Sequence, residues 1–269
     1  MTPDPEKSPF FRQAAVLWAA GVLGTVAVTP YLTELLSEQF AKAEAETGLS
    51  LVVLAAIFVA QTAVLLGVAV VVGLWAARKV GLRAPVSEAL VQRQPVGPVV
   101  KHFAIRSMVV GTATGVVVIL LDLSVFQPLL KGAELPKVAE PALWKGALAS
   151  LYGGIVEELL CRLFLLSVLA LLLTWLSGTR DGLRPWAFWT ANLLAALLFG
   201  VGHLPAAASL LPLTPVIVVR VLILNAVPGL VMDWLYRKRG LEAAMLAHGI
   251  ADLILHVATP AIVGVVHDT

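Results

Sequence analysis

Charged side chains are scarce in this chain of 269 residues: 13% of it is Asp, Glu, Lys or Arg, whereas 59% is apolar. Soluble domains carry about 25% charged residues, so this sequence has too few polar side chains to cover a water-facing globule. The same composition excludes a disordered protein and gives no sign of nucleic-acid binding. Cys161 is the single cysteine, which excludes an internal disulfide. The composition indicates a membrane protein.

Long apolar stretches recur along the whole chain. About 20 mostly apolar residues in helical form cross the hydrocarbon core of a bilayer. We therefore predict an all-α, polytopic membrane protein with about seven to eight transmembrane helices. The stretches lie near residues 13–36, 50–77, 104–125, 146–176, 186–203, 213–236 and 241–260.

Basic residues in the short loops indicate the orientation, because they are enriched on the cytoplasmic side. We predict that the N-terminus is inside and, after seven crossings, the C-terminus outside. In this orientation the inner loops hold twelve basic residues: Lys7, Arg12, Arg78, Lys79, Arg83, Arg93, Lys101, Arg180, Arg184, Arg237, Lys238 and Arg239. The outer loops hold four: Lys42, Lys131, Lys137 and Lys145.

Several ionisable residues fall inside the predicted spans, where a charge costs about 2.5–3.5 kcal/mol and marks a candidate functional site. Arg106, Asp122 and Asp233 lie near span ends, and we assign them to the membrane interface. For Arg220, which is deeper, we expect a structural pair with a carboxylate. The remaining members of the set are Glu157, Glu158, Arg162, His203, His248, Asp252 and His256.

The fourth span carries two adjacent carboxylates and one arginine. Glu158 and Arg162 are four residues apart and lie about 40° from each other on an α-helix, which favours an ion pair. Glu157 lies about 140° from Arg162, so it is left free to act as a general base or acid. The alternative is a buried ion-pair network that only fixes helix packing. Gly153 and Gly154, just before the carboxylates, allow close helix approach.

Histidines mark the fifth and seventh spans. Phe199 lies one turn before His203, and His248 lies one turn before Asp252, so each pair shares a helix face. His256 extends the second stripe by another turn. The alternatives are an interfacial histidine in the fifth span and an aspartate that merely holds a histidine in the seventh.

Together these three motifs resemble the CPBP family of intramembrane proteases, which includes the CAAX prenyl endopeptidases and is also called Abi. We divide the chain accordingly into N-terminal helices without a diagnostic motif (1–141), a CPBP-like protease core (142–260) and a C-terminal tail (261–269). The motifs are Glu157-Glu158-x-x-x-Arg162, Phe199-x-x-x-His203 and His248-x-x-x-Asp252, in this order on three separate spans.

The resemblance implies a glutamate-dependent endopeptidase in a bacterial cytoplasmic membrane. Glu157 and His203 would activate water, and His248 with the residue four beyond it would stabilise the tetrahedral oxyanion. Glu158 and Arg162, with the aromatic residue of the second motif, would support the site. The expected partners are the bilayer and a membrane-associated precursor, lipidated or with a C-terminal sorting tail, and no nucleic acid.

One residue departs from the family pattern, which commonly has Asn where this chain has Asp252. An ionised Asp accepts hydrogen bonds only and repels an oxyanion. Asp252 must therefore be protonated, or must act indirectly by holding His248 in one tautomer.

Three other functions remain open. We expect no cofactor, but zinc-dependent proteolysis is the nearest rival mechanism, although the chain has no His-Glu-x-x-His motif. A secondary transporter would carry ions on the same residues, yet we find no repeated halves. A non-catalytic immunity or scaffold protein is the third alternative. The residues that could hold zinc are Glu157, His203, His248, Asp252 and His256.

Overall fold

The computed structural model describes residues 9–136, 138, 141–178 and 182–262. Three basic residues used for the orientation, Lys7, Lys137 and Arg180, lie outside the described residues, as does most of the predicted tail, 263–269.

The described chain is mostly helical and contains no strand, which confirms the predicted fold class. Seven of its helical stretches are long and apolar enough to cross a membrane. The elements are α1 (Phe10–Leu35), α2 (Ser37–Thr47), α3 (Leu51–Val80), α4 (Pro85–Val91), α5 (Val96–Leu121), η2 (Asp122–Phe126), α6 (Gln127–Leu129), α7 (Leu143–Leu151), η3 (Tyr152–Glu157), η4 (Leu159–Leu166), α8 (Ser167–Leu176), α9 (Pro185–Gly202), α10 (Leu204–Ala208), α11 (Pro215–Arg239), α12 (Leu241–Leu253) and η5 (Ile254–Ala258).

The seven stretches match the predicted spans closely, with one clear difference. The third span covers Val96–Leu129, so it begins well before the predicted residue 104. Pro98, which precedes the predicted span, lies in the first turn of α5. A proline is tolerated there because the first helical N–H groups have no partner within the helix.

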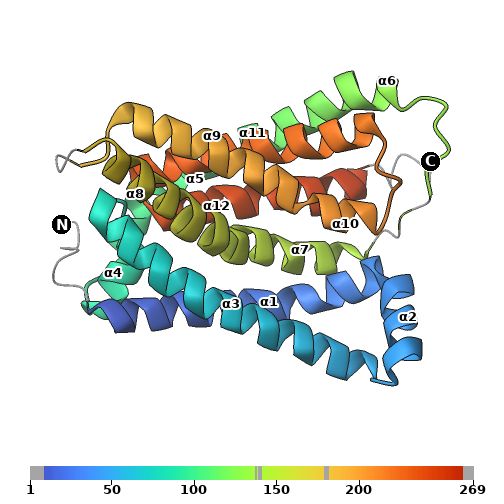
Figure 1. Cartoon of the computed structure of the whole chain (residues 1–269), viewed down its shortest axis with the longest axis horizontal. Helices are drawn as coiled ribbons and strands as arrows, with labels where there is room; N and C mark the ends of the chain where they lie inside the picture. Colours follow the sequence, from blue (N-terminus) through green and yellow to red (C-terminus); the bar gives the residue numbers. More distant parts are fainter. Residues whose placement is uncertain (1–8, 137, 139–140, 179–181, 263–269) are drawn as a thin grey trace.

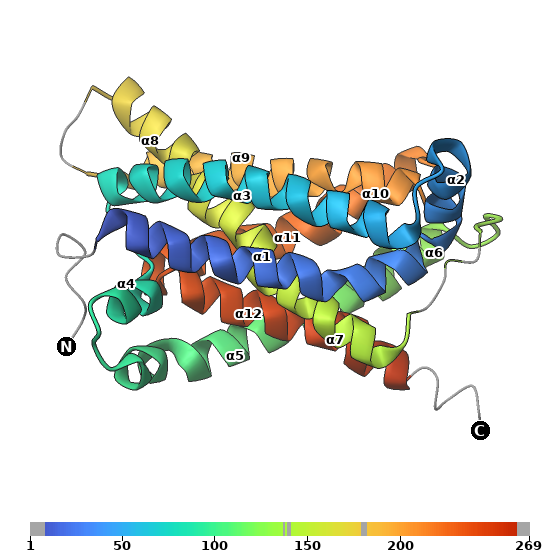
Figure 2. The ribbon, with the colours of Figure 1, turned by 90° about the horizontal axis from the view of Figure 1, so that it is seen from below.

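The long helices run side by side along the longest axis of the molecule (Figures 1 and 2). α4 lies at one end of the bundle, and α2, α6 and α10 lie at the other (Figure 1). Large apolar side chains face outward, among them Leu23, Ile105 and Leu176, which are 70%, 71% and 82% exposed. Such a surface is stable in lipid and not in water.

The fourth span, Leu143–Leu176, is the most buried of the seven, and it contacts α1, α3, α9, α11 and α12. Glycines allow this close packing: a Cβ on Gly73 of α3 would lie 2.5 Å from the carbonyl oxygen of Leu163, and one on Gly24 of α1 would lie 3.0 Å from Val156. The N-terminal helices therefore hold the helix that carries the two adjacent carboxylates.

The middle of this span is π-helical over Tyr152–Glu157 and Leu159–Leu166. A π-helix bonds i to i+5, and such segments often occur at functional sites. The side-chain hydroxyl of Ser167 donates to the carbonyl oxygen of Arg162, five residues earlier, at 3.1 Å. The wider turns change the directions in which side chains point, compared with the α-helix assumed in the sequence analysis.

Candidate active site

Arg162 lies between two carboxylates in the interior of the bundle. Its Nη1 is 3.0 Å from Oε1 of Glu158, and its Nε is 3.0 Å from Oδ1 of Asp233. All three residues are at most 1% exposed. The predicted Glu158–Arg162 pair is present, but the arginine also binds a second acid from α11.

The assignment of Asp233 to the membrane interface is wrong. α11 continues to Arg239, so Asp233 lies more than a turn from the helix end and packs inward against the fourth span. Arg162 has two further contacts: its Nη2 donates to the carbonyl oxygen of Gly229 at 3.2 Å, and its guanidinium lies 4.9 Å from the centre of the Phe199 ring. Arg162 thus joins the fourth, fifth and sixth spans.

His248 joins the seventh span to this cluster through Glu158. Its Nδ1 lies 2.7 Å from Oε1 of Glu158, so that nitrogen carries the proton and donates it to the carboxylate. Glu158 therefore orients His248 as well as pairing with Arg162. The Phe199 ring meets the rings of both histidines edge-on, with centroids 4.6 Å from His203 and 6.1 Å from His248.

Glu157 forms no ion pair with Arg162 and lies between the two histidines. Its Oε1 is 3.9 Å from Nε2 of His203, and its Oε2 is 3.7 Å from Nε2 of His248. The side chains of Glu157 and His203 are 22% and 33% exposed, against 7% for His248. The free carboxylate therefore occupies the accessible edge of the cluster, while Glu158 is sealed inside.

The position of Asp252 bears on its two possible roles. Its Oδ1 lies 3.6 Å from Nε2 of His248, beyond hydrogen-bond distance, and Nδ1 of the same ring is taken by Glu158. A Cβ on Gly153 would overlap Oδ2 of Asp252 and lie 3.4 Å from Nε2 of His248. Glu158, and not Asp252, thus fixes the tautomer of His248, and Gly153 leaves room for the aspartate.

The motifs meet although their depths in the predicted spans differ. The sequence places Glu157 and His203 in the outer half of the bilayer and His248 about 12 Å from the inner end of its span by helix rise. In the structure Glu157 lies within 4 Å of both rings. The packing of the three spans therefore brings their motifs to one place in the bundle.

Other ionisable residues lie outside this cluster. Arg220 binds Asp122 through two contacts of 2.6 and 2.9 Å, which confirms the expected carboxylate partner and shows that Asp122 has a structural role. Arg106 is exposed. The ring of His256 packs edge-on against Tyr31 at 5.9 Å. In the part of the chain that the structure describes, no group of three or more His, Cys, Asp or Glu residues is arranged to hold a metal ion.

A comparison with protein families matches residues 139–254 to the Rce1-like family, described as type II CAAX prenyl endopeptidase Rce1-like. This part of the chain is therefore similar to the CAAX prenyl endopeptidases of that family. The matched range holds all three motifs and confirms the resemblance drawn from them. No curated protein and no solved structure matches the chain.

The CAAX protease match covers a little under half of the chain. It supports a membrane-embedded endopeptidase in general terms, and the seven apolar helices make the protein an integral, multi-pass membrane protein. α1 and α3 lie outside the matched range but pack against it. Asp233 and Gly229 are the site residues that motif spacing missed; the available signal was an acidic residue inside an apolar span.

Proposed function

We propose that this protein is an intramembrane endopeptidase of the glutamic type, which hydrolyses a peptide bond near the membrane-embedded or lipid-anchored end of a precursor. One observation carries the proposal: no arginine among the described residues pairs with Glu157, which lies between His203 and His248 at the exposed edge of a buried cluster of ion pairs. A carboxylate that only stabilised helix packing would be paired, as Glu158 is.

Water activation follows from the proton positions on His203. Its Nδ1 lies 2.8 Å from the carbonyl oxygen of Phe199, so Nδ1 carries the proton and Nε2 of the neutral ring is an acceptor. The 3.9 Å gap between Nε2 and Glu157 is too long for a direct hydrogen bond and suits a bridging water. Such a water donates one hydrogen to Glu157 and the other to His203.

In the proposed reaction Glu157 takes a proton from this water, and the water oxygen bonds to the carbon of the scissile carbonyl. The carbonyl oxygen becomes an oxyanion, which collapses as the peptide C–N bond breaks. The amine that leaves takes up the proton that Glu157 received. Positioned donors for the oxyanion contribute about 3–4 kcal/mol each.

The oxyanion donors in this proposal are His248 and Asp252. The Nδ1–H of His248 donates a hydrogen bond to Glu158. His248 can therefore donate a second hydrogen bond from Nε2 only as an imidazolium, whose charge the surrounding carboxylates compensate. Asp252 can donate only as the neutral acid. Because Asp252 does not reach Nδ1 of His248, we assign it the direct role.

The substrate class follows from where the site is exposed. His203 caps the C-terminal end of α9, next to α10, at the end of the bundle opposite α4 (Figure 1). In the orientation indicated by the basic loops, this end faces the exterior of a bacterial cytoplasmic membrane. We therefore propose a secreted or lipid-anchored precursor, rather than a cytosolic prenylated protein.

The test compares three forms of the gene in a deletion strain: wild type, Glu157→Gln and Glu34→Gln. The last makes the same chemical change at a partly buried carboxylate outside the site, which pairs with Lys145. Mass spectrometry of membrane-protein termini should find a precursor that is cleaved with the wild type and with Glu34→Gln and stays intact with Glu157→Gln. Cleavage by folded Glu157→Gln at the wild-type rate would disprove the proposal.

A further inference from the structure

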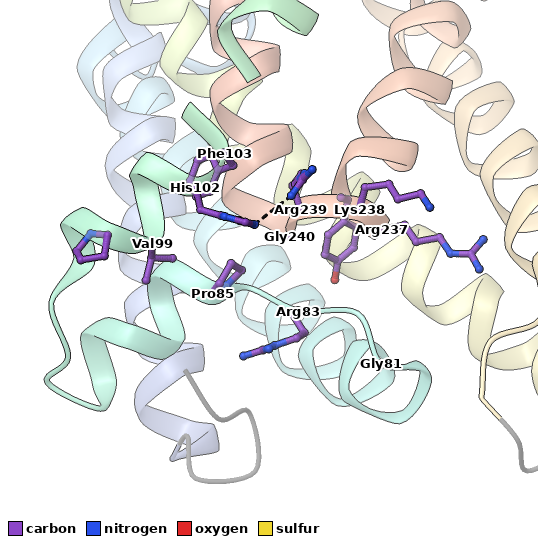
Figure 3. A pocket seen from close by; sticks show the side chains of 12 residues that line it. Gly81, Arg83, Pro85, Val99, His102, Phe103, Arg237, Lys238, Arg239 and Gly240 are labelled. Carbon is purple, nitrogen blue, oxygen red and sulfur yellow. Dashed lines mark hydrogen bonds between the residues drawn. The ribbon is translucent and has the colours of Figure 1, made fainter. Parts of the chain in front are cut away.

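A cavity of about 290 Å³ opens at the end of the bundle near α4, away from His203. It lies where α3 ends, α5 begins and α11 passes directly into α12 (Figure 3). The residues that line it are Gly81, Arg83, Pro85, Pro98, Val99, His102, Phe103, Tyr236, Arg237, Lys238, Arg239 and Gly240.

The charged side chains of this wall, which come from arginine and lysine, are all cationic, and no carboxylate lines it. Two of its arginines have other contacts: Arg83 pairs with Glu88 at 2.5 Å, and the guanidinium of Arg237 lies 4.3 Å from the centre of the Phe188 ring.

Arg239 differs from these two because its partner is uncharged. Its Nη1 lies 3.0 Å from Nε2 of His102 (Figure 3), and the guanidinium is the donor. Among the described residues no carboxylate forms an ion pair with Arg239. Its guanidinium therefore has no direct carboxylate contact in this part of the chain, and it is held in place by a histidine that belongs to a different helix.

The backbone places these two side chains next to each other. Gly240 has a φ of +98°, which favours glycine, and it is the single residue between α11 and α12. A Cβ there would overlap the ring of Pro85. The tight connection brings the basic end of α11 against the first turns of α5, where His102 lies.

The other part of the wall is apolar. Val99 and Phe103 lie on α5 near His102 (Figure 3), and Phe103 is 3% exposed. The cavity thus has a cationic face and an apolar face at the ends of membrane-spanning helices, which is the level of lipid headgroups. Its volume is near the lower end of the range for ligand sites, about 300 Å³, so it suits a headgroup better than a peptide.

We propose that this cavity binds the phosphate group of an anionic membrane lipid, with Arg239 as the main contact. Guanidinium groups bind phosphate oxygens through charged, often bidentate hydrogen bonds. Basic pockets between transmembrane helices on the cytoplasmic side bind anionic headgroups, and the basic loops indicate this side for the α4 end. The cavity combines residues inside and outside the family-matched range. The proposed lipid binding does not depend on the proposed proteolysis.

The test measures which lipid stays bound. Purified full-length protein, stripped of lipid in detergent, is incubated with equal amounts of phosphatidylglycerol and phosphatidylcholine, and retained lipid is counted by native mass spectrometry. We expect one phosphatidylglycerol to be retained preferentially. Arg239→Gln should lower its affinity about fivefold, the effect of one cationic side chain near a lipid headgroup. Arg12→Gln, which removes an exposed charge outside the cavity, should change it less than twofold.

Two further arms make the result decisive. His102→Gln keeps the charge of Arg239 but removes the imidazole ring that holds it, so it should also weaken the retention of phosphatidylglycerol. This variant replaces Arg239→Gln in the test if Arg239→Gln does not fold. Inorganic phosphate at millimolar concentration tests the other source of the same chemistry. Three outcomes would each overturn the lipid site. They are equal retention of both lipids, equal losses of affinity for Arg239→Gln and Arg12→Gln, and a protein that retains inorganic phosphate but no lipid.

Discussion

Arg162→Ala should destabilise the protein more than any other single charge removal in the bundle. The substitution leaves Glu158 and Asp233 facing each other's charge in the interior, and it also removes the donor to Gly229. The charge of the three-residue cluster changes from −1 to −2 with no water to screen it.

The magnitude follows from the burial of both pairs. Removing one partner of a buried ion pair costs about 3–5 kcal/mol, and here one substitution leaves two acids without a partner. Folded proteins are stable by about 5–15 kcal/mol, so most of that margin is lost. Adding Asp233→Asn returns the cluster charge to −1, and Glu158 keeps its hydrogen bond from His248, so Arg162→Ala/Asp233→Asn should recover part of the loss.

The assay is the folded yield and the midpoint of thermal unfolding in detergent, followed by size-exclusion chromatography. Arg220→Ala is the matched control, because its pair with Asp122 is partly exposed, at 25% and 18%, and exposed pairs contribute about 0–1 kcal/mol. If Arg162→Ala is as stable as Arg220→Ala, or if adding Asp233→Asn lowers stability further, the charge argument is wrong.

Three further outcomes are expected. Gly153→Ala should reduce the cleavage rate at least tenfold with a smaller loss of folded yield, because the added methyl group would displace Asp252. The control is Gly202→Ala, where a Cβ meets nothing within 4 Å, and this variant should cleave normally in the same assay. The pH–rate profile should fall on the alkaline side as Asp252 loses its proton. Asp252→Asn should make that limb less steep and leave only the fall caused by deprotonation of the His248 imidazolium, whereas a uniform loss at every pH would contradict the donor role of Asp252. Exhaustive chelation should leave cleavage unchanged, and stoichiometric zinc that is lost on His248→Ala would overturn the metal-free mechanism.

Much of the fold could be predicted from the sequence, because membrane spans are set by length and apolarity. The Glu158–Arg162 pair was also predictable, since four residues bring two side chains together on one helix. Both inferences depend on local spacing, which a single sequence shows directly.

The other features of the candidate site depend on how the helices pack against each other. The Asp233–Arg162 contact joins the fourth and sixth spans, and the spacing within either helix does not indicate it. The π-helical segments could not be predicted from an apolar pattern that fits an α-helix equally well. The convergence of Glu157 with both histidines depends on how the fourth, fifth and seventh spans pack, which helix rise along each separate span does not give.

The Glu158–Arg162 pair also has a consequence for biosynthesis. The fourth span enters the membrane before α11 brings Asp233 and before α12 brings His248. At that time the pair within the helix already compensates its own two charges, each of which alone costs about 2.5–3.5 kcal/mol to insert. Glu157 is then the one acid of this span without a partner in its own helix, and its two histidine partners come only with the fifth and seventh spans.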